Sequence, residues 1–244
     1  FGIYFRKIYC LMKNKNILVV GGSSGIGLEL VKQLASDNQL FVLGRNQAPL
    51  AGLDVHFISH DVTDGTDLDS STLPERLDGF VYCPGSINLR PFKGIKPEVF
   101  QQDMEVNAFG AVRTLQKIAP LLMNSSEASI VFFSTVAVQT GMPFHSSIAM
   151  AKGALEGLTR SLAAEWAPKV RVNSIALSLV DTPLAAKFTN NADKLEKANA
   201  RHPLGRMGSA ADAAQMTVFL LSEKSSWMTG QILHLDGGIG NLKT

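Results

Sequence analysis

The feature that most constrains the fold is a glycine-rich segment, Gly21-Gly22-Ser23-Ser24-Gly25-Ile26-Gly27. Before it, residues 16–20 form a short apolar run, typical of a buried parallel strand. After it, Leu28, Val31 and Leu34 recur at helical spacing. Glycines allow a tight turn and let an anion approach bare backbone, and a helix N-terminus offers that anion unpaired N–H groups. The segment therefore predicts a dinucleotide-binding crevice, with the pyrophosphate held by Gly21, Ser23, Ser24, Gly25, Ile26 and Gly27.

The remaining chain alternates short apolar runs with helical patterns. Further strands are expected at 40–43, 55–59, 80–82, 129–133, 170–176 and 231–235. Helices are expected at 106–123, 147–166 and 210–221. This alternation predicts an α/β fold: a single doubly wound Rossmann-type domain over residues 12–244, with a seven-stranded parallel sheet and helices on both faces. We interpret residues 1–11, which precede Met12, as sequence upstream of the domain or a loose arm.

Composition excludes several classes of protein. A content of 45% hydrophobic and 18% charged residues is typical of a globular chain. The net charge of +2 comes from Arg6 and Lys7 in the arm, so the neutral domain argues against a nucleic-acid partner. Two cysteines, Cys10 and Cys83, are too few for a disulfide framework and favour a reducing, cytoplasmic location. The longest stretch without charged residues, 128–151, is too polar for a membrane span, and we predict no metal site.

The residue after the second strand should select the cofactor. An acidic residue there would hold a ribose 2′-hydroxyl, whereas this chain has Gly44-Arg45-Asn46, with no carboxylate in that position. Arg45 can pair with a 2′-phosphate, and we expect no carboxylate to oppose it; the alternative is a solvated surface arginine. The sequence therefore favours NADP(H) over NAD(H).

Several segments together resemble the short-chain dehydrogenase/reductase family. Val20–Gly27 matches its glycine motif, with Val20 in the place of a threonine, and Asp61-Val62 matches its adenine-contacting pair. Its turn after the fourth strand is represented by Tyr82-Cys83-Pro84-Gly85, which keeps only the glycine of the family pattern. Asn107 matches the helix asparagine of its catalytic tetrad. The segments 203–208, 219–222 and 229–238 look like the bacterial β-ketoacyl-carrier-protein reductase type. The resemblance implies hydride transfer between a nicotinamide cofactor and a small carbonyl or alcohol substrate.

The resemblance also exposes a missing group. In the family a tyrosine exchanges the proton of the substrate oxygen, and a lysine four residues later holds the nicotinamide ribose. Here Lys152 matches the lysine, but Ile148 stands in the tyrosine position. Thr135, or Ser134 beside it, matches the serine that polarises the carbonyl. His145, one helical turn before Ile148, is a candidate substitute for the acid, and the alternative is a histidine at the rim of the cleft.

The segment after the sixth strand contributes further candidate residues. Leu177-Ser178 replaces the usual Pro-Gly beside the nicotinamide, while Val180 and Thr182 keep the pattern whose threonine meets the carboxamide. The resemblance implies a helical substrate lid near 184–203, whose mixed charges (Lys187, Lys194, Lys197, Arg201 and His202 with Asp193 and Glu196) indicate a solvated face rather than an acid-binding patch. An apolar lining is expected from Met142, Phe144, Leu184 and Phe188.

Three functions stay open at this point. The first is an NADP-dependent oxidoreductase, of the class that acts on alcohol and carbonyl groups, with impaired or atypical proton donation. The second is a catalytically inactive dinucleotide-binding sensor, partner subunit or scaffold. The third is another reaction in the same cleft that needs no phenol. The family's pairing of the helices at 106–123 and 147–167 across subunits implies a dimer or tetramer.

Overall fold

The computed structural model describes residues 12–243, so the predicted arm and Cys10 lie outside the described residues. Seven strands form one sheet in the order β3-β2-β1-β4-β5-β6-β9, and every neighbouring pair is parallel. The strands are Asn16–Val20 (β1), Gln39–Gly44 (β2), His56–Ser59 (β3), Gly79–Tyr82 (β4), Ala128–Thr135 (β5), Val170–Leu177 (β6) and Ile232–Leu235 (β9). The predicted seven-stranded parallel sheet is confirmed.

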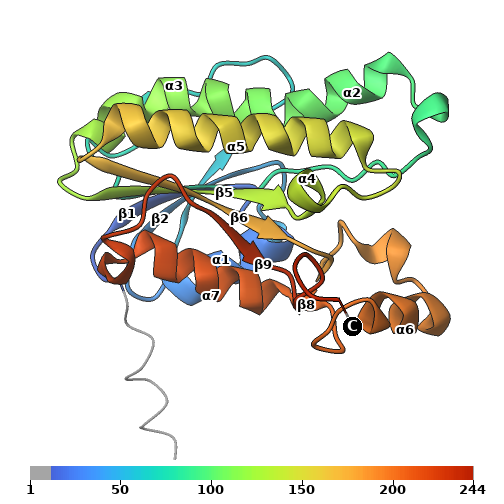
Figure 1. Cartoon of the computed structure of the whole chain (residues 1–244). Coiled ribbons are helices and arrows are strands. Elements are labelled where there is room, and N and C mark those ends of the chain that lie inside the picture. The colour runs from blue at the N-terminus through green and yellow to red at the C-terminus, as the bar shows by residue number, and fades with distance from the viewer. Residues whose placement is uncertain (1–11, 244) are drawn as a thin grey trace, which may run out of the picture.

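Helices cover both faces of the sheet (Figure 1). One face carries Pro97–Met104 (α2), Gly110–Met123 (α3) and Ser146–Trp166 (α5), and the other carries Gly25–Leu34 (α1) and Ala210–Leu221 (α7). A short helix, Ala137–Thr140 (α4), follows β5, and Ala192–Ala200 (α6) projects beyond the sheet. Two short strands of two residues each, Val180–Asp181 (β7) and Gly208–Ser209 (β8), pair with each other in parallel. They lie on either side of the segment that carries α6, and β8 leads directly into α7.

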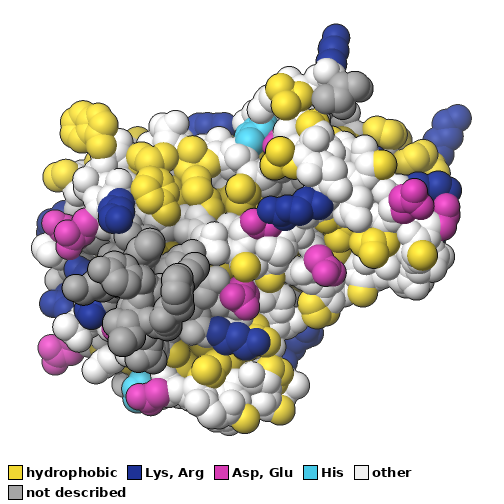
Figure 2. All heavy atoms as spheres, turned by 90° about the horizontal axis from the view of Figure 1, so that it is seen from below, with side chains coloured by type: hydrophobic (Ala, Val, Ile, Leu, Met, Phe, Trp, Pro, Cys, Tyr) yellow, Lys and Arg dark blue, Asp and Glu magenta, His cyan; other side chains and the backbone are white. Residues whose placement is uncertain are grey.

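The alternation of side chains along the strands builds two cores. In β1, Ile17 and Val19 face the core under α1 and α7, while Leu18 and Val20 face the core under α3 and α5. Successive residues of a strand point to opposite faces, so an unbroken apolar run is what a sheet buried on both sides requires. The outer surface is mixed: Figure 2 shows basic, acidic and apolar side chains interspersed on the face seen from below.

The structure differs from the predicted helix at 106–123 in its first turn. Residues Glu105–Phe109 form a π-helical turn that joins α2 to α3, and α2 itself was not predicted. The turn is held by tertiary contacts, because the Tyr82 hydroxyl donates to the Val106 carbonyl at 2.7 Å. A Cβ at Gly110 would lie 2.3 Å from that hydroxyl oxygen, so only glycine fits there.

The crevice expected of this fold lies where the strand order reverses. β1 is paired with β2 on one side and β4 on the other, so the loops after β1 and β4 leave a gap at the carboxyl ends of the strands. None of the helices formed by residues 12–243 is both long and apolar enough to cross a membrane.

Candidate functional site

The glycine segment forms the tight turn that the sequence predicts. Gly21 and Gly25 have φ of +75° and +51°, a backbone region that other residues rarely adopt. A Cβ at Gly27 would lie 2.4 Å from the Gly21 carbonyl oxygen. The Ser24 side chain makes no capping bond to α1, so the N–H groups of the first turn face the crevice without a side-chain cap. The loop thus presents bare backbone and a helix N-terminus, the features that suit a pyrophosphate.

A cleft of about 600 Å³ extends from this loop. It is lined by thirteen of the fifteen predicted cofactor residues: Gly21, Ser23, Ser24, Gly25, Ile26, Gly27, Arg45, Asp61, Val62, Cys83, Pro84, Gly85 and Thr182. The other two, Val180 and Lys152, line a second cavity that adjoins it.

Arg45 has a neighbour that its place in the sequence did not reveal. Its guanidinium lies 3.7 Å from the Asp61 carboxylate, which corrects the expectation that no carboxylate opposes it. Hydrogen bonds from the Thr63 hydroxyl and N–H lower the pKa of Asp61, so that carboxylate is engaged by its own turn. The Arg45 side chain is 80% exposed, and an exposed ion pair contributes less than about 1 kcal/mol. Arg45 therefore remains available to an anion at this end of the cleft.

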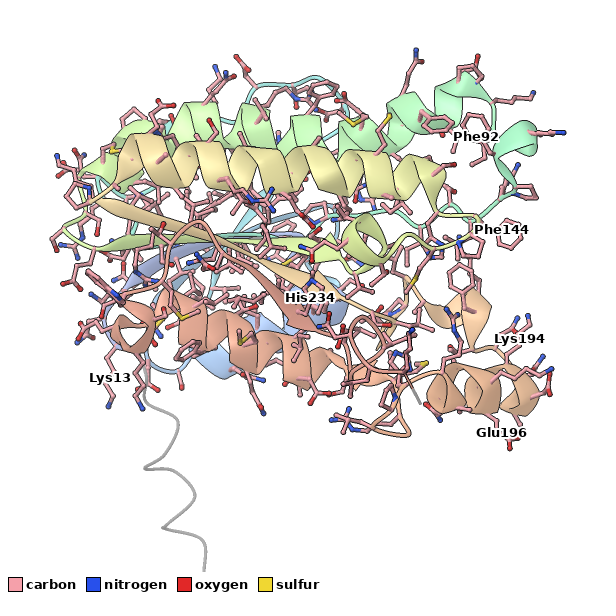
Figure 3. The ribbon with its side chains drawn as sticks, in the orientation of Figure 1. Lys13, Phe92, Phe144, Lys194, Glu196 and His234 are labelled. Carbon is pink, nitrogen blue, oxygen red and sulfur yellow. The ribbon has the colours of Figure 1, made fainter. Side chains whose placement is uncertain are left out.

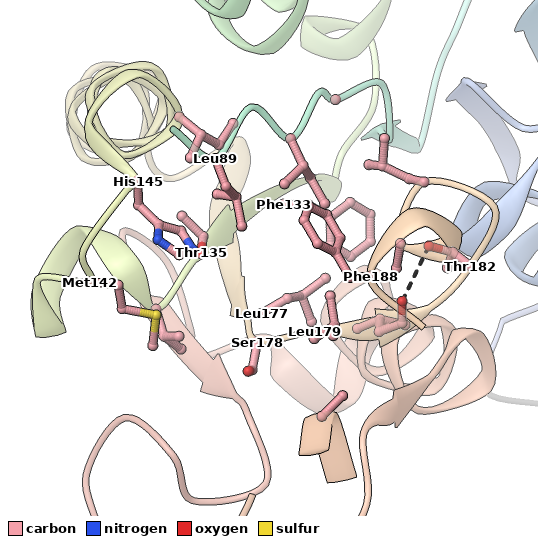
Figure 4. Close-up of a pocket in the computed structure, with 18 of the residues that line it drawn as sticks. Leu89, Phe133, Thr135, Met142, His145, Leu177, Ser178, Leu179, Thr182 and Phe188 are labelled. Carbon is pink, nitrogen blue, oxygen red and sulfur yellow. Dashed lines mark hydrogen bonds between the residues drawn. The ribbon is translucent and has the colours of Figure 1, made fainter. Parts of the chain in front are cut away.

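The second cavity, shown in Figure 4, has a volume of about 400 Å³ and adjoins the first, with which it shares lining residues. The residues common to both are Ile26, Cys83, Gly85, Thr182 and Leu184. Its wall is largely apolar, and of the four residues expected there Met142, Leu184 and Phe188 contribute. Phe144 does not, because it is 55% exposed on the surface. A dinucleotide cleft that adjoins an apolar cavity can bring a nicotinamide and a small substrate together.

Lys152 and Asn107 both lie beside Gly85, which lines both cavities, but Asn107 is fully buried and lines neither. A Cβ at Gly85 would lie 3.2 Å from Asn107 Oδ1 and 3.6 Å from Lys152 Nζ. Lys152 is only 8% exposed, and desolvation lowers its pKa to about 8, against the opposing effects of Cys83 and Asp103. Burial raises the pKa of the Cys83 thiol to about 12, so the thiol stays neutral. Lys152 is thus a nearly buried lysine whose pKa is held below its ordinary value by desolvation.

A polar network behind Asn107 was missed by the sequence analysis. Asn107 Nδ2 donates to Ser86 Oγ and to the Asp103 carbonyl, each at 2.8 Å. The fully buried Asp103 carboxylate accepts from Ser86 at 2.5 Å and from Asn88 at 2.8 Å. The spacing of four residues between Asp103 and Asn107 on one helix was the available signal. The network fixes the amide of Asn107, which lies in the π-helical turn, against the Asp103 carbonyl in α2.

The structure distinguishes the two candidate hydroxyl groups, Ser134 and Thr135, by their hydrogen bonds. Ser134 Oγ donates to the buried Glu156 carboxylate at 2.7 Å, so its proton is already used. Thr135 Oγ1 accepts only a long 3.3 Å bond from the Ala137 N–H and lines the cavity. Ile148, one turn before Lys152 on α5, is buried and lines the same cavity.

Two histidines also line this cavity. His145 precedes α5, and its Nδ1 lies 2.7 Å from the Pro143 carbonyl, which can only accept. Nδ1 therefore carries a proton and Nε2 is left for another partner. Figure 4 shows both His145 and Thr135 pointing into the cavity. His202 is buried and joins α6 to the end of β6, because its Nδ1 donates to the Ala198 carbonyl and its Nε2 accepts from Ser178 Oγ, both at 2.8 Å.

Tyr82 is the described tyrosine nearest the site, and it packs as expected. It is 1% exposed, its hydroxyl is bonded to the Val106 carbonyl, and burial raises its pKa. It does not line either cavity. No group of three metal-ligating side chains occurs within residues 12–243.

Comparisons with known proteins agree with this architecture. Residues 21–240 match the family model described as enoyl-(acyl carrier protein) reductase. An uncharacterized oxidoreductase of Bacillus subtilis is 29% identical, covering 92% of this chain and 98% of its own. A tropinone reductase homologue of Arabidopsis thaliana is 31% identical, covering 93% and 92%. A short-chain type dehydrogenase/reductase from Mycobacterium ulcerans superposes with a TM-score of 0.85 at 29% identity, covering 94% and 90%. The chain belongs to the short-chain dehydrogenase/reductase family, a family of oxidoreductases that bind nicotinamide cofactors.

Proposed function

We propose that this protein is an NADP-dependent oxidoreductase that transfers hydride between the nicotinamide and the carbonyl or alcohol carbon of a small molecule. The observation that carries the proposal is the adjacency of the two cavities, with Lys152 and Thr135 lining the second. Arg45, exposed at the far end of the cleft, supports NADP(H) over NAD(H) because a guanidinium pairs well with a phosphate. The association of subunits that is common in the family supports a dimer or tetramer. The interspersed charges of the surface do not favour a nucleic-acid partner.

The glycine backbone can accept the group that the family implies. Side-chain-free residues at 21, 25 and 27 leave the turn open, and Gly85 leaves space before Asn107 and Lys152. Gly21–Gly27 would hold the pyrophosphate, Arg45 the 2′-phosphate and Lys152 the nicotinamide ribose. When bound, the nicotinamide cofactor supplies or accepts the hydride.

The residues of the second cavity would handle the substrate oxygen. Thr135 would donate a hydrogen bond to it and polarise the carbonyl. His145 would exchange the proton through Nε2, since the Pro143 carbonyl holds Nδ1 and an imidazole exchanges protons near neutral pH. Lys152, with a pKa of about 8, would stay protonated below that pH and donate to hydroxyl groups. Ile148 has no proton to give, which favours slow turnover.

Ile148 also supports a second candidate function, a dinucleotide-binding protein without turnover. A positioned general acid contributes about 10²–10⁴ in rate, so its loss alone could reduce catalysis below a useful level. Both functions require the cofactor, and they differ in whether the proton has a source.

The first experiment measures the thermal stability of the protein with NADPH and with NADH, because a ligand stabilises the fold according to its affinity. A larger shift with NADPH is expected, and no shift with either would refute both functions. Ketone reduction is then followed in His145→Gln, with His56→Gln as the control, since His56 stacks on Phe41 away from both cavities. Loss of turnover in the first variant alone supports the substitute acid.

The variant Ile148→Tyr separates the two functions. If the wild-type protein turns over slowly, the restored phenol should raise the rate by about 10²–10⁴. If the wild-type protein binds NADPH without turnover and the variant reduces ketones, the protein is the inactive form. If neither turns over with bound NADPH, the oxidoreductase proposal is wrong.

A further inference from the structure

One face of α6 carries only basic and small residues toward the second cavity. Lys194, Lys197, Ala198 and Arg201 all line it, and their spacings of three, one and three residues place them on a single helical face. Figure 3 shows Lys194 directed toward the body of the molecule and Glu196 directed away from it. The sequence analysis interpreted the mixed charges of this segment as a solvated face. In the structure the basic side chains Lys194, Lys197 and Arg201 line the cavity, whereas Glu196 does not.

The lining of the cavity carries no carboxylate to balance this charge. The described residues that line it include the exposed Lys194 and Lys197 on α6, the exposed Arg201 directly after it, the buried Lys152 and two histidines, but no aspartate or glutamate. Lys197 is paired with Asp193 at 2.9 Å, and Lys194 donates to the Asn190 amide. Arg201 makes no hydrogen bond or ion pair with another described residue. A concave wall with one sign of charge raises the local concentration of ligands of the opposite sign.

The basic face is held in place over the cavity. His202 follows α6 and bonds both the Ala198 carbonyl and the Ser178 hydroxyl, which ties the end of the helix to the loop after β6. Apolar side chains make up much of the rest of the wall: Leu89, Phe133, Leu177, Leu179 and Phe188. The cavity thus combines the nearly buried Lys152 and the hydroxyl of Thr135 with an apolar wall and exposed basic side chains.

From this arrangement we infer that the substrate is a carbonyl or alcohol compound that carries an anionic group, a carboxylate or a phosphate, at the end remote from its reacting carbon. The anion contacts Lys194 and Arg201, and the carbonyl lies at the end of the cavity lined by Thr135 and Lys152. The inference rests on the proposed function and names the class of substrate that this cavity selects.

The test compares substrates that differ only in the charged group. Levulinate is paired with methyl levulinate, and dihydroxyacetone phosphate with dihydroxyacetone, so the two sources of the anion are measured separately. Each is tested for thermal stabilisation of the protein, with and without saturating NADPH, and for steady-state reduction. We expect the charged member of at least one pair to stabilise the protein more and to have a KM about tenfold lower, with the difference falling at high salt.

The variants locate the effect. The double variant Lys194→Gln/Arg201→Gln should raise the KM of the anionic compound about tenfold and leave that of its neutral partner unchanged. Lys224→Gln removes an exposed charge far from the cavity, and Glu196→Gln alters the outer face of α6, and both should behave as wild type.

The outcomes separate this inference from the proposed function. Equal affinity for charged and neutral partners in the wild-type protein would overturn the inference, even if neutral ketones are reduced. An equal loss for both partners in the double variant would also overturn it. Stabilisation by an anion that the double variant abolishes would support the inference even if no compound is reduced, in which case the proposed function fails alone.

Discussion

The buried ammonium group of Lys152 should make the stability of the protein depend on pH in a defined window. The side chain is 8% exposed, and no described residue lies in hydrogen-bond contact with Nζ. Desolvation lowers its pKa from 10.5 to about 8. A tenfold change in proton affinity corresponds to about 1.4 kcal/mol, so a charged Lys152 costs the folded protein about 3 kcal/mol.

The sign follows from the two pKa values. Between pH 8 and 10.5 the folded protein has lost the Lys152 proton while the unfolded chain still binds it. Stability rises with pH wherever the unfolded state binds more protons. The Lys152 penalty is therefore complete below pH 8 and is relieved as the pH rises to about 10.5.

The assay is urea unfolding of NADPH-free protein at several values between pH 7 and pH 10.5. The variant Lys152→Met keeps the length of the side chain and removes the charge, so it should exceed the wild-type protein in stability by up to about 3 kcal/mol at pH 7. The difference should shrink toward zero by pH 10.5. Other titrating groups affect both proteins equally and cancel. Lys224→Met, at an exposed lysine, serves as the control and should match wild type throughout.

The reasoning would be refuted by a stability difference that stays constant with pH. That result would mean that Lys152 keeps its ordinary pKa and reaches water in the absence of the cofactor. The same variant should bind NADPH more weakly at pH 7, because the ammonium is the donor proposed for the nicotinamide ribose.

Two other predictions concern backbone and helix ends. Gly27→Ala should abolish stabilisation by NADPH, since its Cβ would lie 2.4 Å from the Gly21 carbonyl oxygen. The control, Gly157→Ala, lies within α5 with open space around it, so it should bind NADPH normally and gain up to about 1 kcal/mol of stability. Equal NADPH binding by the two variants would contradict this. Ser209→Ala should cost about 1 kcal/mol by calorimetry, because it removes the capping box that Ser209 forms with Asp212 at the start of α7, and an unchanged melting temperature would argue against it.

The strands were predictable because their cause is local. The run of residues 16–20 is apolar and is stopped by glycine, and the structure forms β1 over the same residues. The π-helical turn at Glu105–Phe109 was not predictable, because the pattern there continues into α3 without interruption. Its support comes from Tyr82, which is 24 residues away from Val106 in sequence. A contact between residues so far apart in sequence does not alter the local hydrophobic periodicity, so the pattern could not predict it.

The site divides in the same way. The glycine turn and Arg45, the residue after β2, could be located because each lies at a predicted junction of elements. The Asp103–Ser86 contact and the Ser178–His202 pair join residues 17 and 24 positions apart, so only the fold brings them together. On α6 the helical spacing of the basic residues was visible in the sequence. The missing information was which face of the helix meets the cavity.

Ile148 and the low pKa of Lys152 have a common cause. Residues four apart on a helix are neighbours, so the side chain at 148 helps to decide how dry the lysine is. A tyrosine at position 148 would give Nζ a polar neighbour, whereas isoleucine gives none. Ile148 therefore both lacks the proton donor and adds to the desolvation of the Lys152 ammonium. A buried charge without a partner costs the fold several kcal/mol unless a ligand offsets it. Ribose hydroxyl groups of a cofactor bound in the adjoining cleft would offset this cost by accepting hydrogen bonds from the ammonium. The proposed cofactor would therefore account for a lysine at this buried position.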